Sequence, residues 1–199
     1  MQKRHINPPK KIDLVIRAAR KLFVEKGFRG VAIPEIVKES GVSVGAIYLH
    51  FDNKEKLAQT VYQYTLDQFT EQFSECLAGR ETAQDKLSAF AELVFELTEE
   101  DPDMMEFMLS ACKEIRSHLI IPLCTSDAFT EVQQIVKRGI TSGDIKAGNY
   151  FLTAISYTGV ILRAADLRLQ GIIEQPLHDI SAELIDNAWS SISAAPLPS

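Results

Sequence analysis

Residues 33–51 read IPEIVKESGVSVGAIYLHF, and this stretch decides the expected fold of the first part of the chain. A proline is tolerated in the first turn of a helix because its missing N–H has no partner there, so a short helix is expected over residues 34–40. Gly41 lets the chain reverse without a Cβ clash. Ser43 is placed to cap a second short helix through about His50. Two short helices joined by a tight turn are what a helix-turn-helix requires.

Helical periodicity continues on both sides of this stretch. A one-sided helix ending near Gly27 is predicted by the apolar spacing of Ile12, Val15, Ile16, Ala19, Leu22 and Phe23. Its basic positions are supplied by Lys10, Lys11, Arg17, Arg20 and Lys21. Downstream, Asn53 is placed to cap a longer helix whose inward face holds Leu57, Val61, Tyr64 and Phe69.

The remainder of the chain also has helical spacing, and no sustained alternation of apolar and polar residues predicts a strand. Further helices are expected at about residues 83–99, 103–116, 126–142, 150–170 and 178–193, separated by proline and glycine. The expected fold is therefore all-α with about nine helices. We expect a helix-turn-helix domain over residues 1–53 with a basic leader at 1–11, a helical domain over 54–193, and a flexible tail at 194–199.

The charge of the chain is divided between its two parts. Of the 199 residues, 46% are hydrophobic and 24% charged, which is typical of a globular protein, and the net charge is −6. Residues 1–60 hold 12 Lys and Arg against 6 Asp and Glu, a net +6, while the remainder holds 9 against 21, a net −12. A basic module fused to an acidic body predicts that the first part meets a polyanion. No apolar stretch is long enough to span a membrane, which predicts a cytoplasmic location.

Signatures of enzymes and metal sites are missing from the sequence. The three cysteines and four histidines have no metal-ligand spacing, and no Gly-rich phosphate loop or serine-nucleophile motif is present. We expect no metal and no cofactor. An enzyme that uses Glu99, Asp101 or His118 for acid–base chemistry is disfavoured, because no orienting partner stands at a recognisable spacing.

A wider pattern extends the helix-turn-helix signal over about residues 12–60. It consists of Ile16-x-Ala18-Ala19-x-x-Leu22-Phe23-x-Glu25-x-Gly27-Phe28, then Ile36 and Gly41-Val42-Ser43-x-Gly45-x-Ile47-Tyr48-x-His50-Phe51-x-x-Lys54-Glu55-x-Leu57. This pattern resembles the N-terminal DNA-binding domain of TetR-family transcriptional regulators. The resemblance implies a homodimer whose third helix enters the major groove of an operator, and a helical C-terminal domain that binds a small effector and forms the dimer.

The resemblance also implies roles for individual residues. Base contacts are expected from Ser43, Val44 and Ala46, with Gly45 allowing close approach, and backbone contacts from Tyr48, His50 and Lys54. Other interpretations stay open: Tyr48 as a half-buried core residue, His50 as a helix cap, and Lys54 as a complement to the next helix start.

One position departs from the family pattern. A hydroxyl often stands at the start of the second helix, but this chain has Val31-Ala32-Ile33 there. Backbone N–H groups at that helix start, with Arg29 nearby, remain as a predicted phosphate contact. The basic leader, which includes Lys3 and Arg4, is predicted either to track the DNA as an arm or to act as a solubilising tail.

The acidic body offers candidates for an effector pocket and a dimer interface. The pocket is predicted to involve Phe90, Met104, Met105, Phe107, Met108, Cys112 and Tyr157, although residues of these types are more often plain core. The acidic run at residues 99–103 is interpreted as a solvated turn. Residues 150–193 are predicted to form a homodimer, with close helix approach allowed by Gly159, Ala164 and Ala165.

Together these features predict a ligand-responsive transcriptional regulator. In the favoured version it is a repressor that binds a palindromic operator as a dimer and is released by a small-molecule effector. The alternative is a small-molecule-binding protein on the same scaffold without operator recognition.

Overall fold

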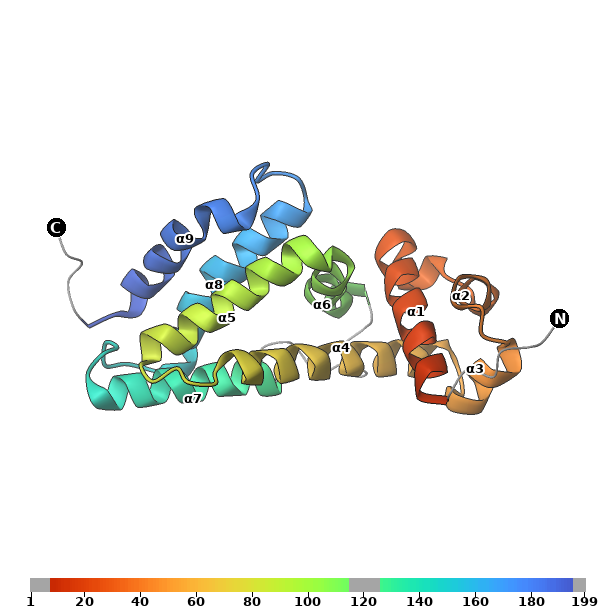
Figure 1. Cartoon of the computed structure of the whole chain (residues 1–199), viewed down its shortest axis with the longest axis horizontal. Helices are drawn as coiled ribbons and strands as arrows, with labels where there is room; N and C mark the ends of the chain where they lie inside the picture. Colours follow the sequence, from red (N-terminus) through yellow and green to blue (C-terminus); the bar gives the residue numbers. More distant parts are fainter. Residues whose placement is uncertain (1–7, 115–125, 195–199) are drawn as a thin grey trace.

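The computed structural model of the chain describes residues 8–114 and 126–194. Within these residues it forms nine helices and no strand, apart from one isolated bridge between Ile145 and Ser193. In chain order (Figure 1) the helices are α1 (Pro8–Gly30), α2 (Ile33–Ser40), α3 (Val44–His50), α4 (Lys54–Cys76), α5 (Ala83–Glu100), α6 (Pro102–Glu114), α7 (Asp127–Ser142), α8 (Tyr150–Leu169) and α9 (Leu177–Ile192). The predicted all-α fold is confirmed. The predicted ends at residue 116 and in the tail after 194 lie outside the described residues.

Helices α1, α2 and α3 pack around a shared apolar centre that includes the buried side chains of Ile16, Ile36 and Ile47. The regular part of α1 is interrupted at Gly27, whose φ of 70° favours glycine, and the chain continues helically to Gly30. The helix begins at Pro8, earlier than the sequence pattern predicted. Lys10 and Lys11 therefore belong to α1 and not to a disordered arm, whereas Lys3 and Arg4 lie outside the described residues.

The turn between α2 and α3 has the predicted chemistry. Gly41 adopts a left-handed conformation with φ of 67°, and its N–H donates to the carbonyl of Val37 at 3.0 Å. Ser43 caps α3, since its hydroxyl oxygen accepts the N–H of Ala46 at 3.4 Å. These contacts fix the angle between the two helices of the helix-turn-helix.

Helix α4 connects the two parts of the molecule (Figure 1). Its predicted cap is confirmed: the side chain of Asn53 accepts the N–H of Lys56 at 2.7 Å. Leu57, near its start, is fully buried, while Tyr64 is half-buried and donates its hydroxyl to the carboxylate of Asp13 at 2.8 Å. The first half of α4 is thus tied to α1 by both apolar and polar contacts.

Helix α5 lies at the centre of the larger domain, in contact with α4, α6, α7, α8 and α9. In Figure 1, α5, α8 and α9 lie side by side, and α7 runs along the second half of α4. Apolar residues cover most of the circumference of α5, as expected for a central helix. Its buried residues include Leu87, Phe90, Ala91, Leu93, Val94, Phe95 and Leu97. None of the helices built from the described residues combines the length and apolar composition needed to cross a bilayer.

Helix α7 makes its closest approach to its neighbours at Gly139, which is buried. A β-carbon at this position would stand 2.6 Å from the δ-carbon of Ile145 and 3.1 Å from the β-carbon of Ala83. Ile145 is itself buried, and its N–H donates to the carbonyl of Gly139 at 3.0 Å. The absence of a side chain at residue 139 therefore lets α7, α5 and the loop after α7 come together.

Candidate nucleic-acid interface and regulatory core

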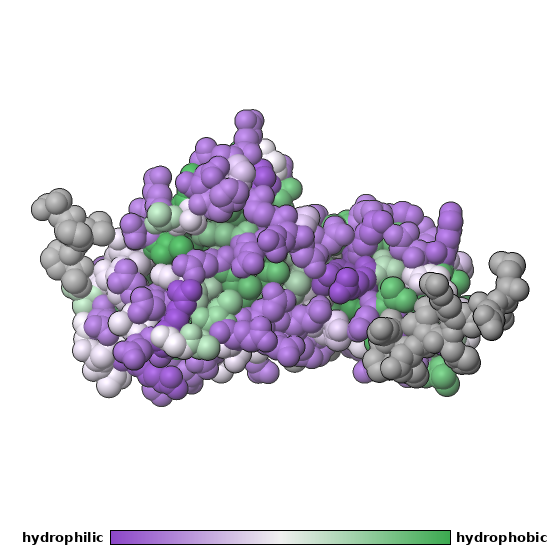
Figure 2. Space-filling view, in the orientation of Figure 1, coloured by the Kyte–Doolittle hydropathy of each residue, from purple (hydrophilic) through white to green (hydrophobic). Residues whose placement is uncertain are grey.

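Helix α3 presents apolar side chains to solvent. Val44 is 50% exposed, Tyr48 52% and Leu49 80%, while Ile47 on the opposite face is buried and anchors the helix. Apolar surface is visible in Figure 2 at the edge of the small domain where α3 lies in Figure 1. Leu49 therefore faces solvent. Exposed apolar groups on so short a helix are typical of a surface that meets a partner.

The other predicted DNA contacts do not share one environment. Ser43, Gly45, His50 and Arg29 are exposed, whereas Ala46 is half-buried and packs against the core. Ser43 accepts a capping hydrogen bond, and its own O–H remains able to donate. No atom outside the local backbone lies within 4 Å of a β-carbon built on Gly45, so this face of α3 is open.

Lys54 has an intramolecular role that sequence reasoning missed. Its ammonium donates to the carbonyls of Phe28 at 2.7 Å and Val31 at 2.8 Å, and lies 4.4 Å from the centre of the Phe28 ring. The phosphate contact of Lys54 stays a prediction, with one N–H beyond these two bonds available for it. A signal was present in the sequence, because a lysine in the first turn of a helix is opposed by the helix dipole and needs acceptors nearby.

At the start of α2, where relatives often have a hydroxyl side chain, the carboxylate of Glu35 takes part in capping the helix. Glu35 accepts the N–H of Ala32 at 2.9 Å and pairs with the ammonium of Lys26 at 2.5 Å. The hydrogen bond from Lys26 holds the pKa of Glu35 below its usual value, and the bond from Ala32 acts in the same direction. The Ala32 N–H is therefore engaged by a side chain of the protein, which leaves the predicted phosphate contact at this helix start with fewer free donors.

The predicted effector residues are all buried where their side chains are described: Phe90, Met104, Met105, Phe107, Met108 and Tyr157. Cys112 belongs to α6, but its side chain lies outside the described residues. All six belong to the same apolar core, in which Phe90 packs against Phe69 and Phe73 of α4, and Phe107 against Phe23 of α1. The grooves on the surface of the described residues include four of 290–470 Å³, and these four are not lined by the six side chains. Their role in ligand binding stays a prediction.

Tyr157 stands out among these buried residues. Its side chain is fully buried in α8, and its hydroxyl has no hydrogen-bond partner among the described residues. Burial raises the pKa of the phenol well above its ordinary value, so the group is a neutral donor. An unsatisfied buried hydroxyl costs about 1–3 kcal/mol. Such a group in an apolar centre marks a position where a ligand acceptor would be stabilised.

The acidic run at residues 99–103 has specific partners. Glu99 accepts two hydrogen bonds from the guanidinium of Arg168, at 2.9 and 3.0 Å, and the N–H of Leu177 at 2.9 Å. Asp101 pairs with Arg20 at 2.8 Å. The helix end and helix start predicted here are confirmed, since α5 ends at Glu100 and α6 begins at Pro102. The run connects helices and does more than fill a solvated turn.

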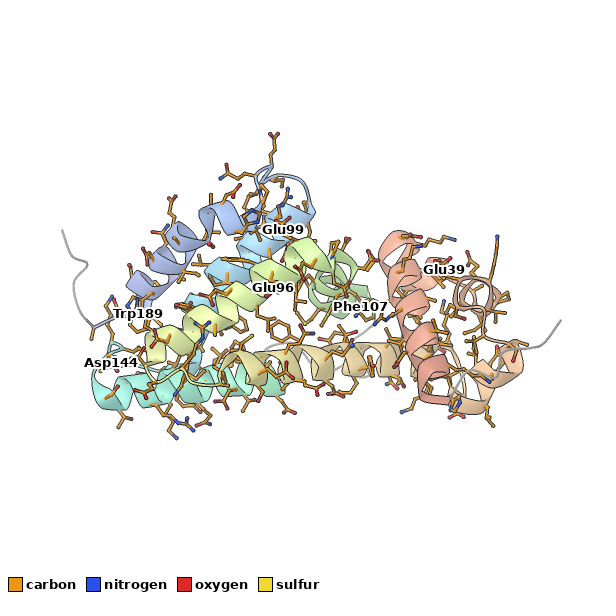
Figure 3. The ribbon with its side chains drawn as sticks, viewed as in Figure 1. Glu39, Glu96, Glu99, Phe107, Asp144 and Trp189 are labelled. Atoms are coloured by element: carbon orange, nitrogen blue, oxygen red, sulfur yellow. The ribbon has the colours of Figure 1, made fainter. Side chains whose placement is uncertain are left out.

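Glu99→Gln is expected to lower the free energy of unfolding by about 1 kcal/mol at pH 7, because one carboxylate joins α5 to α8 and to the start of α9, with partial screening by solvent. Chiefly through Arg168, the folded-state pKa of Glu99 is lowered, so its contribution is present above the unfolded pKa and disappears as pH falls through the folded pKa. Urea unfolding at pH 7 and in acid checks this. Glu96→Gln, an exposed site on α5 (Figure 3), is the control. Equal losses in both variants would contradict the assignment.

The last two helices leave an apolar face open on the single chain. On α8, Leu152 and Ile155 are exposed together with Gly159, and on α9 Leu184 and Ile185 are half-buried. The prediction that Ala164 and Ala165 allow close helix approach across an interface is wrong, because both side chains are buried within the chain. Ala188 and Ile192, which lie in the segment predicted to form the dimer, are also buried inside the domain.

An exposed recognition helix in a helix-turn-helix, carried by a long helix into a larger helical domain, defines a DNA-binding transcriptional regulator. The sequence model of "Bacterial regulatory proteins, tetR family" matches residues 15–61. Residues 15–61 of the chain therefore resemble the DNA-binding domain of this family of regulators.

Relatives among curated proteins agree with this assignment. The fatty acid metabolism regulator protein of Bacillus subtilis (strain 168) is 28% identical over 138 residues, which is 67% of this chain and 70% of the relative. The uncharacterized HTH-type transcriptional regulator YerO of the same organism is 43% identical over 54 residues, 27% of this chain and 19% of that protein. The second match is confined to a segment about the size of the DNA-binding domain.

Solved structures show the same fold over nearly the whole chain. A TetR family transcription regulator from Marinobacter aquaeolei VT8 superposes with a TM-score of 0.80 at 19% identity, covering 93% of this chain and 96% of the other. FadR from Bacillus subtilis in complex with stearoyl-CoA superposes with a TM-score of 0.73 at 23% identity, covering 90% and 98%.

Proposed function

We propose that the chain is a one-component repressor that binds a palindromic operator as a homodimer and leaves it when a small effector binds the larger domain. The observation that carries this proposal is the exposed apolar face of α3, with Val44, Tyr48 and Leu49 in solvent on an otherwise basic N-terminal domain. Val44, with Ser43 and Ala46, is assigned to the bases, and Tyr48, with His50, Arg29 and Lys54, to the phosphates. Valine and alanine side chains suit the methyl group of thymine.

The open apolar face of α8 and α9 is assigned to the dimer. Leu152, Ile155, Leu184 and Ile185 lose solvent when the same face of a second copy covers them, as a two-fold interface requires. The two α3 helices of such a dimer are then held at one separation. Half-sites about 34–36 Å apart, one turn of DNA, match this arrangement.

A long-chain acyl thioester is the proposed class of effector. The Bacillus subtilis FadR structure contains stearoyl-CoA, and this chain shares its fold. The centre of the larger domain here is apolar and includes Met104, Met105 and Met108, whose flexible side chains can repack around an acyl chain. The unpaired hydroxyl of Tyr157 supplies one donor for a thioester carbonyl. The effector must prefer the conformation that does not bind DNA, since equal affinity for both would shift nothing.

Fluorescence anisotropy with a labelled duplex from immediately upstream of the chain's own gene tests the proposal, with a scrambled duplex as control. We expect tighter binding to the upstream duplex, with a steep negative dependence on salt concentration. Stearoyl-CoA is expected to weaken this binding, and free CoA to leave it unchanged. Equal, weak binding of both duplexes at every salt concentration would overturn the operator assignment.

A small-molecule-binding protein without operator recognition is the second candidate. The observation in its favour is the carboxylate of Glu35 at the start of α2, which holds the N–H of Ala32 and repels a phosphate. Ligand binding without any sequence-specific DNA affinity would select this candidate.

A further inference from the structure

The DNA-binding domain meets the larger domain through contacts between α1 and α6. We infer that Arg20 is a positioning residue: its ion pair with Asp101 sets the orientation of the DNA-binding domain and transmits the state of the larger domain to α3. The transmission part rests on the proposed function, whereas the orientation part concerns the chain alone.

The ion pair combines a buried cation with a partly exposed anion. The side chain of Arg20 is 8% exposed and that of Asp101 40%, and the Nη2 to Oδ2 distance is 2.8 Å. The other oxygen of Asp101 accepts the N–H of Met104 at 3.1 Å, in the first turn of α6. The carboxylate of Asp101 therefore binds α1 and also caps the start of α6. A shift of α6 would move this carboxylate relative to Arg20.

An aromatic contact lies beside the ion pair. Phe107 of α6 stacks on Phe23 of α1, with ring centres 6.1 Å apart and an interplanar angle of 18°, and meets the edge of Tyr62 of α4 at 6.2 Å. Figure 3 shows Phe107 in the space between α6, α4 and α1. The ring contacts supply attraction without fixing a single orientation. Between α1 and α6 the directional contact is the guanidinium–carboxylate pair, while α4 is joined to α1 separately by the hydrogen bond from Tyr64 to Asp13.

Movement of α1 carries the recognition helix with it. Lys21 of α1 pairs with Glu39 of α2 at 2.7 Å, and Lys26 pairs with Glu35 at 2.5 Å. Buried residues of α1, α2 and α3 pack in one apolar core, which continues into α6 where Phe23 meets Phe107. A rotation of α1 against α6 is therefore a rotation of the whole helix-turn-helix against the rest of the molecule.

The hydrogen-bonding capacity of Arg20 is only partly used in this pair, which suits a contact that opens during regulation. Nη1 of Arg20 is buried and has no hydrogen-bond partner in the described part of the chain. A groove of about 470 Å³ opens beside it, lined by residues of both domains that include Arg17, Glu39 and Asp103. The buried charge of Arg20 is therefore compensated by one strong bond. A shift of α6 that lengthens this bond leaves the charge uncompensated, which is energetically costly.

The two partners differ in what their removal leaves behind. Arg20→Met leaves Asp101 without its cation but in contact with water. Asp101→Asn keeps an acceptor for Met104, yet it leaves the buried charge of Arg20 without an anion, which is the costlier state. We expect Asp101→Asn to lower the free energy of unfolding more than Arg20→Met, although both break the same pair.

Distance measurements by pulsed electron spin resonance test the orientation without DNA. Spin labels at Lys38→Cys on α2 and Gln134→Cys on α7, both exposed, report the separation of the domains in a background with Cys76, Cys112 and Cys124 changed to Ala. We expect a narrow distribution in the parent and a broader or shifted one in Arg20→Met. Arg17→Met, an exposed arginine one turn earlier on α1, is the matched control and keeps the parent distribution.

Operator affinity then tests transmission. We expect Arg20→Met to weaken operator binding about tenfold and to reduce the response to stearoyl-CoA, while the salt dependence stays unchanged because no phosphate contact is lost. The double variant with Asp101→Asn should bind no worse than Arg20→Met. Should Arg20→Met fold poorly, Arg20→Gln, which also removes the positive charge but keeps a polar side chain, gives the same comparison.

The outcomes are separable. A distance distribution and an operator affinity in Arg20→Met that match those of Arg17→Met would overturn the role of the pair, whatever happens to thermal stability. A parent protein without sequence-specific DNA binding would overturn the proposed function, and the distance measurement would still decide whether Arg20 orients the domain.

Discussion

Gly139→Ala is expected to lower the free energy of unfolding by about 2 kcal/mol. The added methyl meets two atoms of Ile145 at 2.6 and 2.9 Å and the β-carbon of Ala83 at 3.1 Å. Ile145 cannot withdraw into solvent, because it is buried. Urea unfolding monitored by circular dichroism measures the change.

The sign of this effect is informative. Replacing a mid-helix glycine by alanine stabilises by about 1 kcal/mol where space is free, so the clash has to exceed that gain. Gly45→Ala, which adds the same methyl to a helix with nothing within 4 Å, is the control and is expected to stabilise. A Gly139 variant as stable as the Gly45 variant would show that α7 can move away from α5 at little cost.

Gly45→Ala is also expected to weaken operator binding by roughly 10- to 100-fold while it stabilises the fold. Its β-carbon would project from the open face of α3, next to the exposed Val44 and Tyr48, into the space that a DNA groove floor would occupy. Anisotropy titrations with the upstream duplex, together with urea unfolding, measure the two effects in one variant.

A Gly45→Ala variant that folds more stably but binds the operator more weakly would show that residue 45 contacts DNA and is not needed for folding. Gly148→Ala, an exposed loop position before α8, adds a methyl far along the chain from α3 and should leave operator affinity unchanged. Unaltered affinity in Gly45→Ala would remove this face of α3 from the interface.

Local chemistry explains why much of the fold was predictable. Gly41, Ser43 and Asn53 act through neighbours within four residues, so their effects on helix ends are written in the sequence. The exposure of Val44 and Tyr48 agrees with the roles that the family resemblance implied for them.

Partners distant in the sequence account for what was missed. Arg20 looked like one of several basic positions on α1, but its partner lies 81 residues away. Lys54 was expected to contact the DNA backbone or to complement the next helix start, and its two carbonyl acceptors lie 26 and 23 residues away. Ala164 and Ala165 have the size that suits a dimer interface and a monomer core alike, and only the packing of α8 shows which they serve.

The unbroken course of α4 limits how this protein can be recombined with others. A hybrid cut at residue 53 would remove the ammonium of Lys54 from the carbonyls that end α1, and would deprive the small domain of Leu57. It would also separate Tyr64 from Asp13. A transplantable operator-binding module must therefore extend beyond Tyr64, so that any foreign sensor is spliced within a helix and has to match its phase.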